Sequence, residues 1–378
     1  MQLKRTLPLA LASSVTAQST TSLTDALGAQ NSSLSTLNGI LQSSGLGQRL
    51  SSLSNVTILA PNNDALNALL NQTGAAATPA DNAALTALLN YHVLNGTQYA
   101  DNIGNTSVFI PTYLTNETYA NITGGQRVEA RMSDNNVTFF SALKQNASVV
   151  TANLNFTGGV IHIIDGVLSI PENVTDTLSN ANLTAAAGAI KAANLDVGSM
   201  RDVTIFAPNN DAFNAVGSVL ANLSTEDLAS TLGYHVIENN VAYSSGLQNS
   251  TLTTMNGKDV TISVINGTVF VNSAKVTVPD LLVSNGVVHV IDQVLNPGNT
   301  TATPDPTASS ATPAYTSASS GTAGVPFTSG VATPTTTFPA ATSGGSAATS
   351  TSNPGAPMKT AAVGAAALFG GAAMLANF

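Results

Sequence analysis

The residues of this sequence best suited to chemistry are its histidines, because histidine carries acid–base reactions and binds metals near neutral pH. The chain has four: His92, His162, His235 and His289. An aspartate stands three residues after His162 and after His289, which would suit a metal site or a proton-transfer pair. Both histidines, however, lie in apolar, strand-like stretches, and position i+3 on a strand points to the opposite face. We therefore expect buried structural histidines, with metal binding and catalysis as the alternatives.

The rest of the sequence offers no pattern for catalysis or for a cofactor. It contains no cysteine, no His-Glu-x-x-His metal motif and no Gly-x-Ser-x-Gly nucleophile elbow. Its net charge is −9, without a basic cluster beyond the extreme N-terminus, which argues against nucleic acid and against anionic lipid head groups as partners. We expect no enzymatic activity and no cofactor.

The two ends of the chain carry targeting signals. Residues 1–17 have the basic start, apolar stretch and small-residue cleavage site of a secretory signal peptide, with a disordered start as the alternative. Residues 359–378 form an apolar tail that follows small residues and a polar spacer, the order of a GPI-attachment signal. Ser352 or Asn353 is the expected attachment residue, and a membrane-spanning helix is the alternative for the tail.

Residues 297–358 form a separate, nearly uncharged region rich in Pro, Ser, Thr, Ala and Gly. Such a composition cannot bury enough apolar surface to fold. It is typical of a disordered, O-glycosylated stalk. A stalk between a membrane anchor and folded domains would hold those domains away from the membrane.

Motifs for N-linked glycosylation are spread along the chain. They start at Asn31, Asn71, Asn95, Asn105, Asn116, Asn121, Asn136, Asn146, Asn173, Asn182, Asn222, Asn249, Asn266 and Asn299. Two further motifs, at Asn55 and Asn155, lie within or beside apolar strands, so we expect some motifs to stay unmodified. Charged residues make up only 8% of the chain, and glycans would supply the solubility that charge does not.

The chain contains an internal repeat, marked by three landmarks in the same order. VTILAPNNDAL at 56–66 returns as VTIFAPNNDAF at 203–213. A Tyr-His pair follows in each copy, and an apolar stretch around a histidine closes it. The gaps between matching landmarks shrink from 147 to 127 residues, so copy one carries about 20 extra residues. A period this long indicates a duplicated domain.

The first landmark predicts a strand-to-helix corner. Its strand ends at Pro208, which has no N–H for a ladder. Asn209 then caps the helix, and Asp211 lies in the first turn, where the helix dipole favours a negative charge. The equivalents in copy one are Pro61, Asn62 and Asp64. This structural interpretation outweighs a catalytic role for either aspartate.

Together, TIFAPNNDAF, YHVI and NGVVHVIDQVL resemble the fasciclin (FAS1) domain, and the same set recurs in copy one. The resemblance implies an α+β fold: two tandem domains, 18–170 and 171–296, each an antiparallel β-sandwich or wedge with several short helices. It also implies extracellular adhesion, often on GPI anchors in fungi and plants. The chain is most similar to fungal fasciclin-like surface proteins.

The resemblance suggests adhesion residues at two places. An adhesive Asp-Ile/Leu pair of animal members corresponds to Asp280-Leu281, whereas copy one has Asn153-Leu154. Because Pro279 precedes it, we expect Asp280 on an exposed bend, with capping of a turn as the alternative. The family's Tyr-His motif, linked to adhesion in animals, has core packing as its alternative. Its residues here are Tyr91, His92, Tyr234 and His235.

The sequence therefore predicts a non-enzymatic surface adhesion or wall-associated glycoprotein. Its expected partners are cell-wall polysaccharide or extracellular matrix and surface proteins, and a GPI anchor would attach it to the membrane. Two domains on one stalk would raise avidity for a repetitive surface. The alternative is an extracellular carrier of a lipophilic small ligand, which a content of only 5% aromatic residues and no Trp disfavours.

Overall fold

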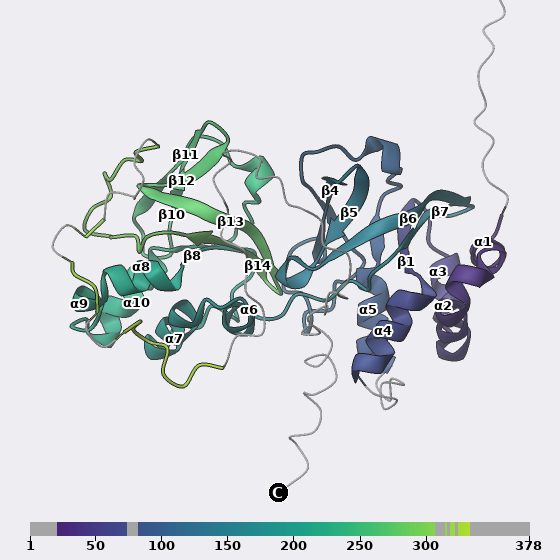
Figure 1. The fold of residues 1–378 in the computed structure, drawn as a ribbon, viewed down its shortest axis with the longest axis horizontal. Helices are drawn as coiled ribbons and strands as arrows, with labels where there is room; N and C mark the ends of the chain where they lie inside the picture. Colours follow the sequence, from purple (N-terminus) through teal and green to yellow (C-terminus); the bar gives the residue numbers. More distant parts are fainter. Residues whose placement is uncertain (1–20, 74–81, 307–313, 316–317, 322–323, 333–378) are drawn as a thin grey trace, which may run out of the picture.

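The computed structural model describes residues 21–73, 82–306, 314–315, 318–321 and 324–332. The predicted signal peptide at 1–17, the GPI tail at 359–378, and Ser352 and Asn353 lie outside the described residues. The described chain forms two lobes side by side, domain 1 and domain 2 (Figure 1).

Domain 1 begins with three helices, continues through a strand and two more helices, and ends in a sheet. Its helices are α1 (Leu23–Ala29), α2 (Asn31–Ser44), α3 (Leu46–Ser51), α4 (Asn63–Thr73) and α5 (Asn82–Tyr91), with short 3₁₀ turns η2 (Ala100–Asn102) and η3 (Ala142–Lys144). Its strands are β1 (Val56–Pro61), β2 (Val93–Asn95), β3 (Val108–Pro111), β4 (Arg127–Ser133), β5 (Asn136–Phe140), β6 (Asn146–Phe156) and β7 (Gly159–Ile164).

Domain 2 has a similar order, with two helices before its first strand and three after it. Its helices are α6 (Val174–Asn180), α7 (Thr184–Ala192), α8 (Asn210–Ala215), α9 (Gly217–Leu220) and α10 (Thr225–Gly233), with the 3₁₀ turn η4 (Ser244–Gly246). Its strands are β8 (Val203–Pro208), β9 (Val236–Ile237), β10 (Ser250–Thr253), β11 (Asp259–Ile265), β12 (Thr268–Val271), β13 (Ala274–Val283) and β14 (Gly286–Ile291).

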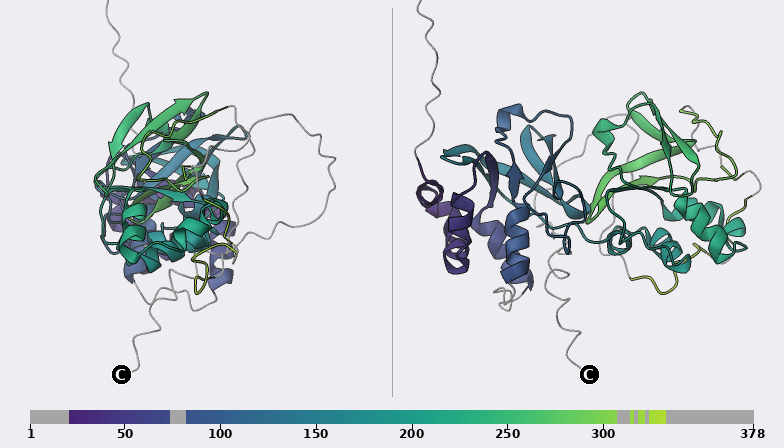
Figure 2. Two further views of the ribbon diagram at one scale, coloured as in Figure 1. Left: turned by 90° about the vertical axis from the view of Figure 1, so that its left-hand side faces the viewer. Right: turned by 180° about the vertical axis from the view of Figure 1, so that it is seen from behind.

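Both domains contain the same seven-stranded sheet. The order is β2-β1-β7-β6-β5-β4-β3 in domain 1 and β9-β8-β14-β13-β12-β11-β10 in domain 2. The predicted α+β class with short helices is confirmed. One detail differs from an all-antiparallel sheet, because β1 pairs with β7, and β8 with β14, in parallel. The helices of both domains lie on the same side of the molecule, below the sheets in Figure 1 and from behind in Figure 2.

The repeated phrase folds into the predicted strand-to-helix corner. The Asn209 side chain accepts the Ala212 N–H at 2.8 Å, and Asn62 accepts the Ala65 N–H at the same distance. Asp211 and Asp64 lie in the first turns of their helices. The polar residues of the repeated phrase therefore begin a helix, and its apolar residues form the buried strands β1 and β8.

Two other local features of domain 2 follow from neighbouring residues. Ser224 caps α10 by accepting the Asp227 N–H, and Asp227 accepts the Ser224 hydroxyl in return. Asn266 and Gly267 both have positive φ, +51° and +76°, as a type I′ turn between β11 and β12 requires.

The extra residues of copy one are inserted at two connections. The segment from β3 to β4 runs from 112 to 126, whereas its counterpart in domain 2 runs only from 254 to 258. The segment from β5 to β6 spans 141 to 145, against 272 to 273. Both insertions lie on the side of domain 1 that contacts domain 2.

The described part of the predicted stalk packs against domain 2. Tyr315, Val325 and Phe327 lie on its helical core, and the Phe327 ring meets Phe213 edge-on at 6.3 Å between centroids. Ser319 and Ser218 exchange two hydrogen bonds, of 3.1 and 2.9 Å. The Pro/Ser/Thr composition of the region gave no sign of this contact, because only a few aromatic and aliphatic residues make it.

Candidate functional site

The Tyr-His pair of copy one lies in the core of domain 1. Tyr91 is fully buried and its hydroxyl donates to the Arg127 carbonyl at 3.0 Å. His92 Nδ1 lies 2.8 Å from the Leu88 carbonyl, and its Nε2 accepts the Leu168 N–H at 2.9 Å. This arrangement requires a neutral ring with its proton on Nδ1.

The pair of copy two repeats every one of these bonds. Tyr234 donates to the Asp259 carbonyl at 2.8 Å, and His235 uses the Thr231 carbonyl and the Leu295 N–H, each at 2.8 Å. Burial lowers the pKa of His92 and of His235 to about 4. All four side chains of the motif are buried, so a partner in solution cannot reach them in this conformation. These four side chains therefore pack in the domain cores, which is the alternative to an adhesive role.

The strand histidines are buried and hydrogen-bonded, as the sequence predicts. His289 Nε2 donates to the Ala242 carbonyl at 2.8 Å, and Nδ1 accepts the Asp280 N–H at 3.2 Å. His162 makes equivalent bonds to the Gln98 carbonyl at 2.8 Å and from the Asn153 N–H at 3.2 Å. Burial lowers the pKa of both rings, which keeps them neutral.

The aspartates after these histidines face elsewhere. Asp165 accepts the Ser148 N–H at 2.6 Å, and Asp292 accepts the Lys275 N–H at 2.8 Å.

Within the ranges described, no three His, Asp or Glu side chains come together as a metal-binding group. In the same part of the chain, no helix is both long and apolar enough to cross a membrane.

The expectation that Asp280 lies on an exposed bend is wrong. Pro279 is exposed, but Asp280 is only 2% exposed and Leu281 is fully buried. The register of β13 against β14 shifts here, and Asp280 takes the left-handed φ of +59°. This β-bulge turns the carboxylate inward.

The Asp280 carboxylate caps a turn, which is the alternative that the sequence left open. It accepts the Ser244 N–H at 2.7 Å and also the Ser244 hydroxyl, which ties η4 to the bulge. In copy one, Asn153 has φ +60° and accepts the Ala100 N–H at 3.0 Å. Asn and Asp tolerate left-handed φ better than other residues with a side chain, which explains their use at both bulges.

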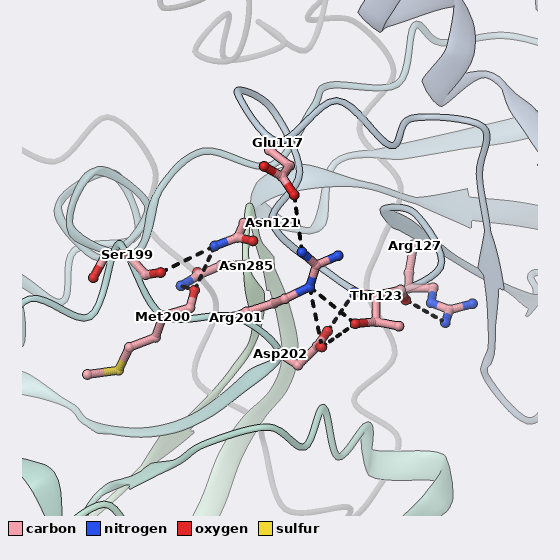
Figure 3. Close-up of polar contacts among 9 residues, drawn as sticks. All are labelled: Glu117, Asn121, Thr123, Arg127, Ser199, Met200, Arg201, Asp202 and Asn285. Atoms are coloured by element: carbon pink, nitrogen blue, oxygen red, sulfur yellow. Dashed lines mark hydrogen bonds and ion pairs between the residues drawn. The ribbon is translucent and has the colours of Figure 1, made fainter.

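Sequence reasoning missed the polar contact between the two domains, which the insertion at 112–126 builds (Figure 3). Asn121 Nδ2 donates to the Met200 carbonyl at 3.1 Å and lies 3.4 Å from that of Ser199. Thr123 donates its N–H and its hydroxyl to the Asp202 carboxylate at 2.7 and 2.5 Å. The excess of about 20 residues in copy one was the only signal in the sequence that could have led to it.

An ion pair lies at the exposed rim of the domain contact, and buried residues lie at the centre of the contact. Arg201 lies 3.2 Å from Glu117, with side chains 46% and 77% exposed, so this pair contributes less than about 1 kcal/mol. Fully buried Gln126 donates to the Val283 carbonyl across the domains at 3.0 Å. Leu143, from the second insertion, belongs to the apolar core of domain 2.

An aromatic stack adds to the same contact. The rings of Phe109 in domain 1 and Tyr243 in domain 2 are 4.0 Å apart and nearly parallel, at 10°. Such a pair is worth about 0.5–1.5 kcal/mol beyond its buried area. Polar, apolar and aromatic contacts together fix the two domains to each other.

The predicted glycosylation asparagines lie on the outside of this pair of domains, with two exceptions. Asn121 and Asn299 are half-buried, whereas the other twelve are exposed. Asn121 is the one at the domain contact, and its side-chain amide is already used there.

The comparisons with known proteins agree with this duplicated architecture. The family model described as the fasciclin domain matches residues 32–171 and 181–297. The "Fasciclin-like arabinogalactan protein" of Arthroderma benhamiae is 38% identical over 221 residues, 58% of this chain and 52% of that protein. The present chain thus spans about half of that relative.

Two other relatives and one solved structure show similarity. "Fasciclin-like arabinogalactan protein elcF" of Phaeosphaeria nodorum is 30% identical over 69% of this chain and 84% of that protein. Human "Periostin" is 32% identical over 40% of this chain and 19% of that protein. A FAS1 domain pair from the insect cell adhesion molecule Fasciclin I is 21% identical, with a TM-score of 0.34, over 71% of this chain and 98% of that one.

Proposed function

The chain belongs to the fasciclin domain family, and on this premise we propose that it is a non-enzymatic, cell-surface glycoprotein that mediates adhesion. The fungal relatives are named as fasciclin-like arabinogalactan proteins, which supports an extracellular glycoprotein. The partners would be cell-wall polysaccharide or extracellular matrix and surface proteins.

The observation that carries this proposal is the fixed pairing of two family domains. Residues 112–126 and 141–145 of copy one hold domain 2 in place, while the histidines and Asp280 serve internal hydrogen bonds. A partner would therefore contact the outer surface of the pair and its glycans. Two fixed surfaces that engage one repetitive target gain affinity through effective concentration.

The anchor and the stalk complete the proposal. The tail at 359–378 would direct GPI attachment near Ser352 or Asn353 after the signal peptide at 1–17 is removed. The residues after Val331 would then separate the domain pair from the membrane. Glycans on the exposed asparagines would keep a weakly charged surface soluble.

The experiment that tests the proposal displays the full chain on cells that lack it. Adhesion of these cells to immobilised wall polysaccharide or matrix protein is compared with that of cells carrying an empty vector. We expect stronger adhesion, which phosphatidylinositol-specific phospholipase removes together with the protein. Equal adhesion of both cell populations would contradict the proposal.

A further inference from the structure

Domain 1 contains a large apolar cavity beneath its sheet. Its volume is about 450 Å³, within the range of about 300–1,000 Å³ usual for small-molecule sites. The walls come from α1, α2, α3, α4, α5 and β1, and they consist mainly of leucine side chains, such as Leu41, Leu59 and Leu66. Figures 1 and 2 show α2, α4 and α5 side by side at this place.

The mouth of the cavity is largely apolar as well. Six of its apolar lining side chains are only half-buried, namely Val167 and, from three neighbouring helices, Ile40, Leu69, Leu70, Leu85 and Leu89. Apolar side chains that stay partly accessible to solvent in one place are a feature of ligand-binding grooves. The described part of the mouth therefore offers an apolar molecule an uncharged surface.

The polar atoms in the wall are already in use. Ser43 and Ser44 donate their hydroxyls to the Ile40 carbonyl at 3.1 and 2.7 Å. His92 uses both ring nitrogens within the domain. Among the described residues, no Lys, Arg, Asp or Glu side chain lines the cavity. A ligand in its interior must therefore be uncharged, because a buried charge without a partner is strongly unfavourable.

In domain 2, larger side chains fill the space that corresponds to the cavity of domain 1. The equivalent cavity in domain 2 measures about 20 Å³. The repeated phrase places Phe206 and Phe213 there, where copy one has Leu59 and Leu66. The bulkier rings account for part of the difference in volume.

The described residues after β14 pack on the helices of domain 2, and none of them packs on the helices of domain 1. Phe327 lies against α7 so closely that a Cβ at Gly188 would overlap the Phe327 carbonyl oxygen. Gly39 is the counterpart in α2, and a Cβ added there would meet no atom within 4 Å. Among the residues that the structure describes, the α2 position equivalent to Gly188 therefore has no covering segment.

We propose that the cavity of domain 1 binds an uncharged apolar small molecule, either a flat polycyclic compound or an aliphatic chain. The volume is about three times that of the ~150 Å³ apolar cavity that holds one benzene. Destabilisation grows with the volume of an empty apolar cavity, so a ligand here also stabilises domain 1. This site goes beyond the adhesive role and does not depend on it.

The test is a fluorescence titration of the mature chain, released from the membrane by phosphatidylinositol-specific phospholipase and purified without detergent, with the uncharged dye Nile red. We expect saturable binding of one dye per chain. Pyrene and 1-hexadecanol, added separately as competitors, distinguish a polycyclic from an aliphatic ligand. Displacement by either supports the proposal, and displacement by neither contradicts it.

Two matched variants locate the bound dye. Leu85→Trp fills the mouth and should weaken binding at least tenfold, whereas Val150→Trp, at a 54% exposed site of β6, should leave it unchanged. Melting curves check that both variants fold. If Leu85→Trp does not fold, Leu69→Phe takes its place as the variant that fills the mouth. Binding that survives the mouth variant, or that Val150→Trp weakens equally, overturns the proposal.

Discussion

The backbone N–H of Asp280 donates to Nδ1 of His289 at 3.2 Å, and Asn153 and His162 repeat this bond at the same distance in the other domain. The histidine thus holds the β-bulge, and the bulge residue's side chain holds the neighbouring 3₁₀ turn. Residues that a family resemblance associates with adhesion serve here as internal supports. The outer surface is left for recognition.

Asp280 gives a direct test of this structural role. Asp280→Ala leaves the Ser244 N–H without its acceptor and puts alanine at φ +59°, so it should lower the free energy of unfolding by roughly 2–4 kcal/mol. Asp280→Asn should cost less than about 1 kcal/mol, because Asn153 already fills this position in copy one. Urea denaturation measures both, and an equal loss for the two variants would refute the capping role.

The buried histidines predict loss of stability in acid. His92 and His235 have pKa values lowered from 6.5 to about 4, so the unfolded chain binds more protons between these pH values. The free energy of unfolding should fall as the pH drops below 6.5 and level off near pH 4, by roughly 3 kcal/mol per histidine.

Burial raises the pKa of Glu172 and of Asp292, and these two carboxyls act in the opposite direction. The comparison is therefore between the natural chain and the double variant His92→Gln/His235→Gln in chemical denaturation from pH 8 to 4. The variant should show a flatter pH dependence. Parallel curves would mean that these rings do not titrate with folding.

The stack across the domains has a natural control. Tyr243 and Tyr99 precede the equivalent 3₁₀ turns, but only Tyr243 stacks on a ring of the other domain, and Tyr99 is 38% exposed. Tyr243→Ala should weaken the domain contact by about 2 kcal/mol, and small-angle scattering should show a larger radius of gyration. Tyr99→Ala should change neither, and identical profiles for the two variants would argue against a fixed pair.

Glycosylation at the domain contact should be blocked. A glycan on Asn121 Nδ2 would lie where the Met200 carbonyl now accepts a hydrogen bond, so modification and domain contact exclude each other. Asn116 heads a motif in the same insertion and is exposed. Peptide mass spectrometry after enzymatic deglycosylation in heavy-oxygen water should label Asn116 and leave Asn121 unlabelled. Labelling of Asn121 in most molecules would show that the domains do not meet as described.

Local chemistry made much of the fold predictable. The Asn209 cap, the Asn266-Gly267 turn and the buried strands follow from a few neighbouring residues each, and the return of three landmarks in the same order made the duplication visible. The orientation of Asp280 was not predictable, because a bulge depends on the register between two strands. The domain contact and the cavity depend on side chains far apart in sequence, such as Thr123 with Asp202 and Leu41 with Leu85.

Adhesion of cells that display the full chain tests the central claim most directly. Cells carrying the natural chain and cells carrying Tyr243→Ala, at equal surface density, are placed on immobilised wall polysaccharide or matrix protein under flow. We predict firm adhesion by the natural chain, weaker adhesion by the variant, and release of both by phosphatidylinositol-specific phospholipase. Adhesion no stronger than that of cells without the chain would contradict a surface adhesion protein.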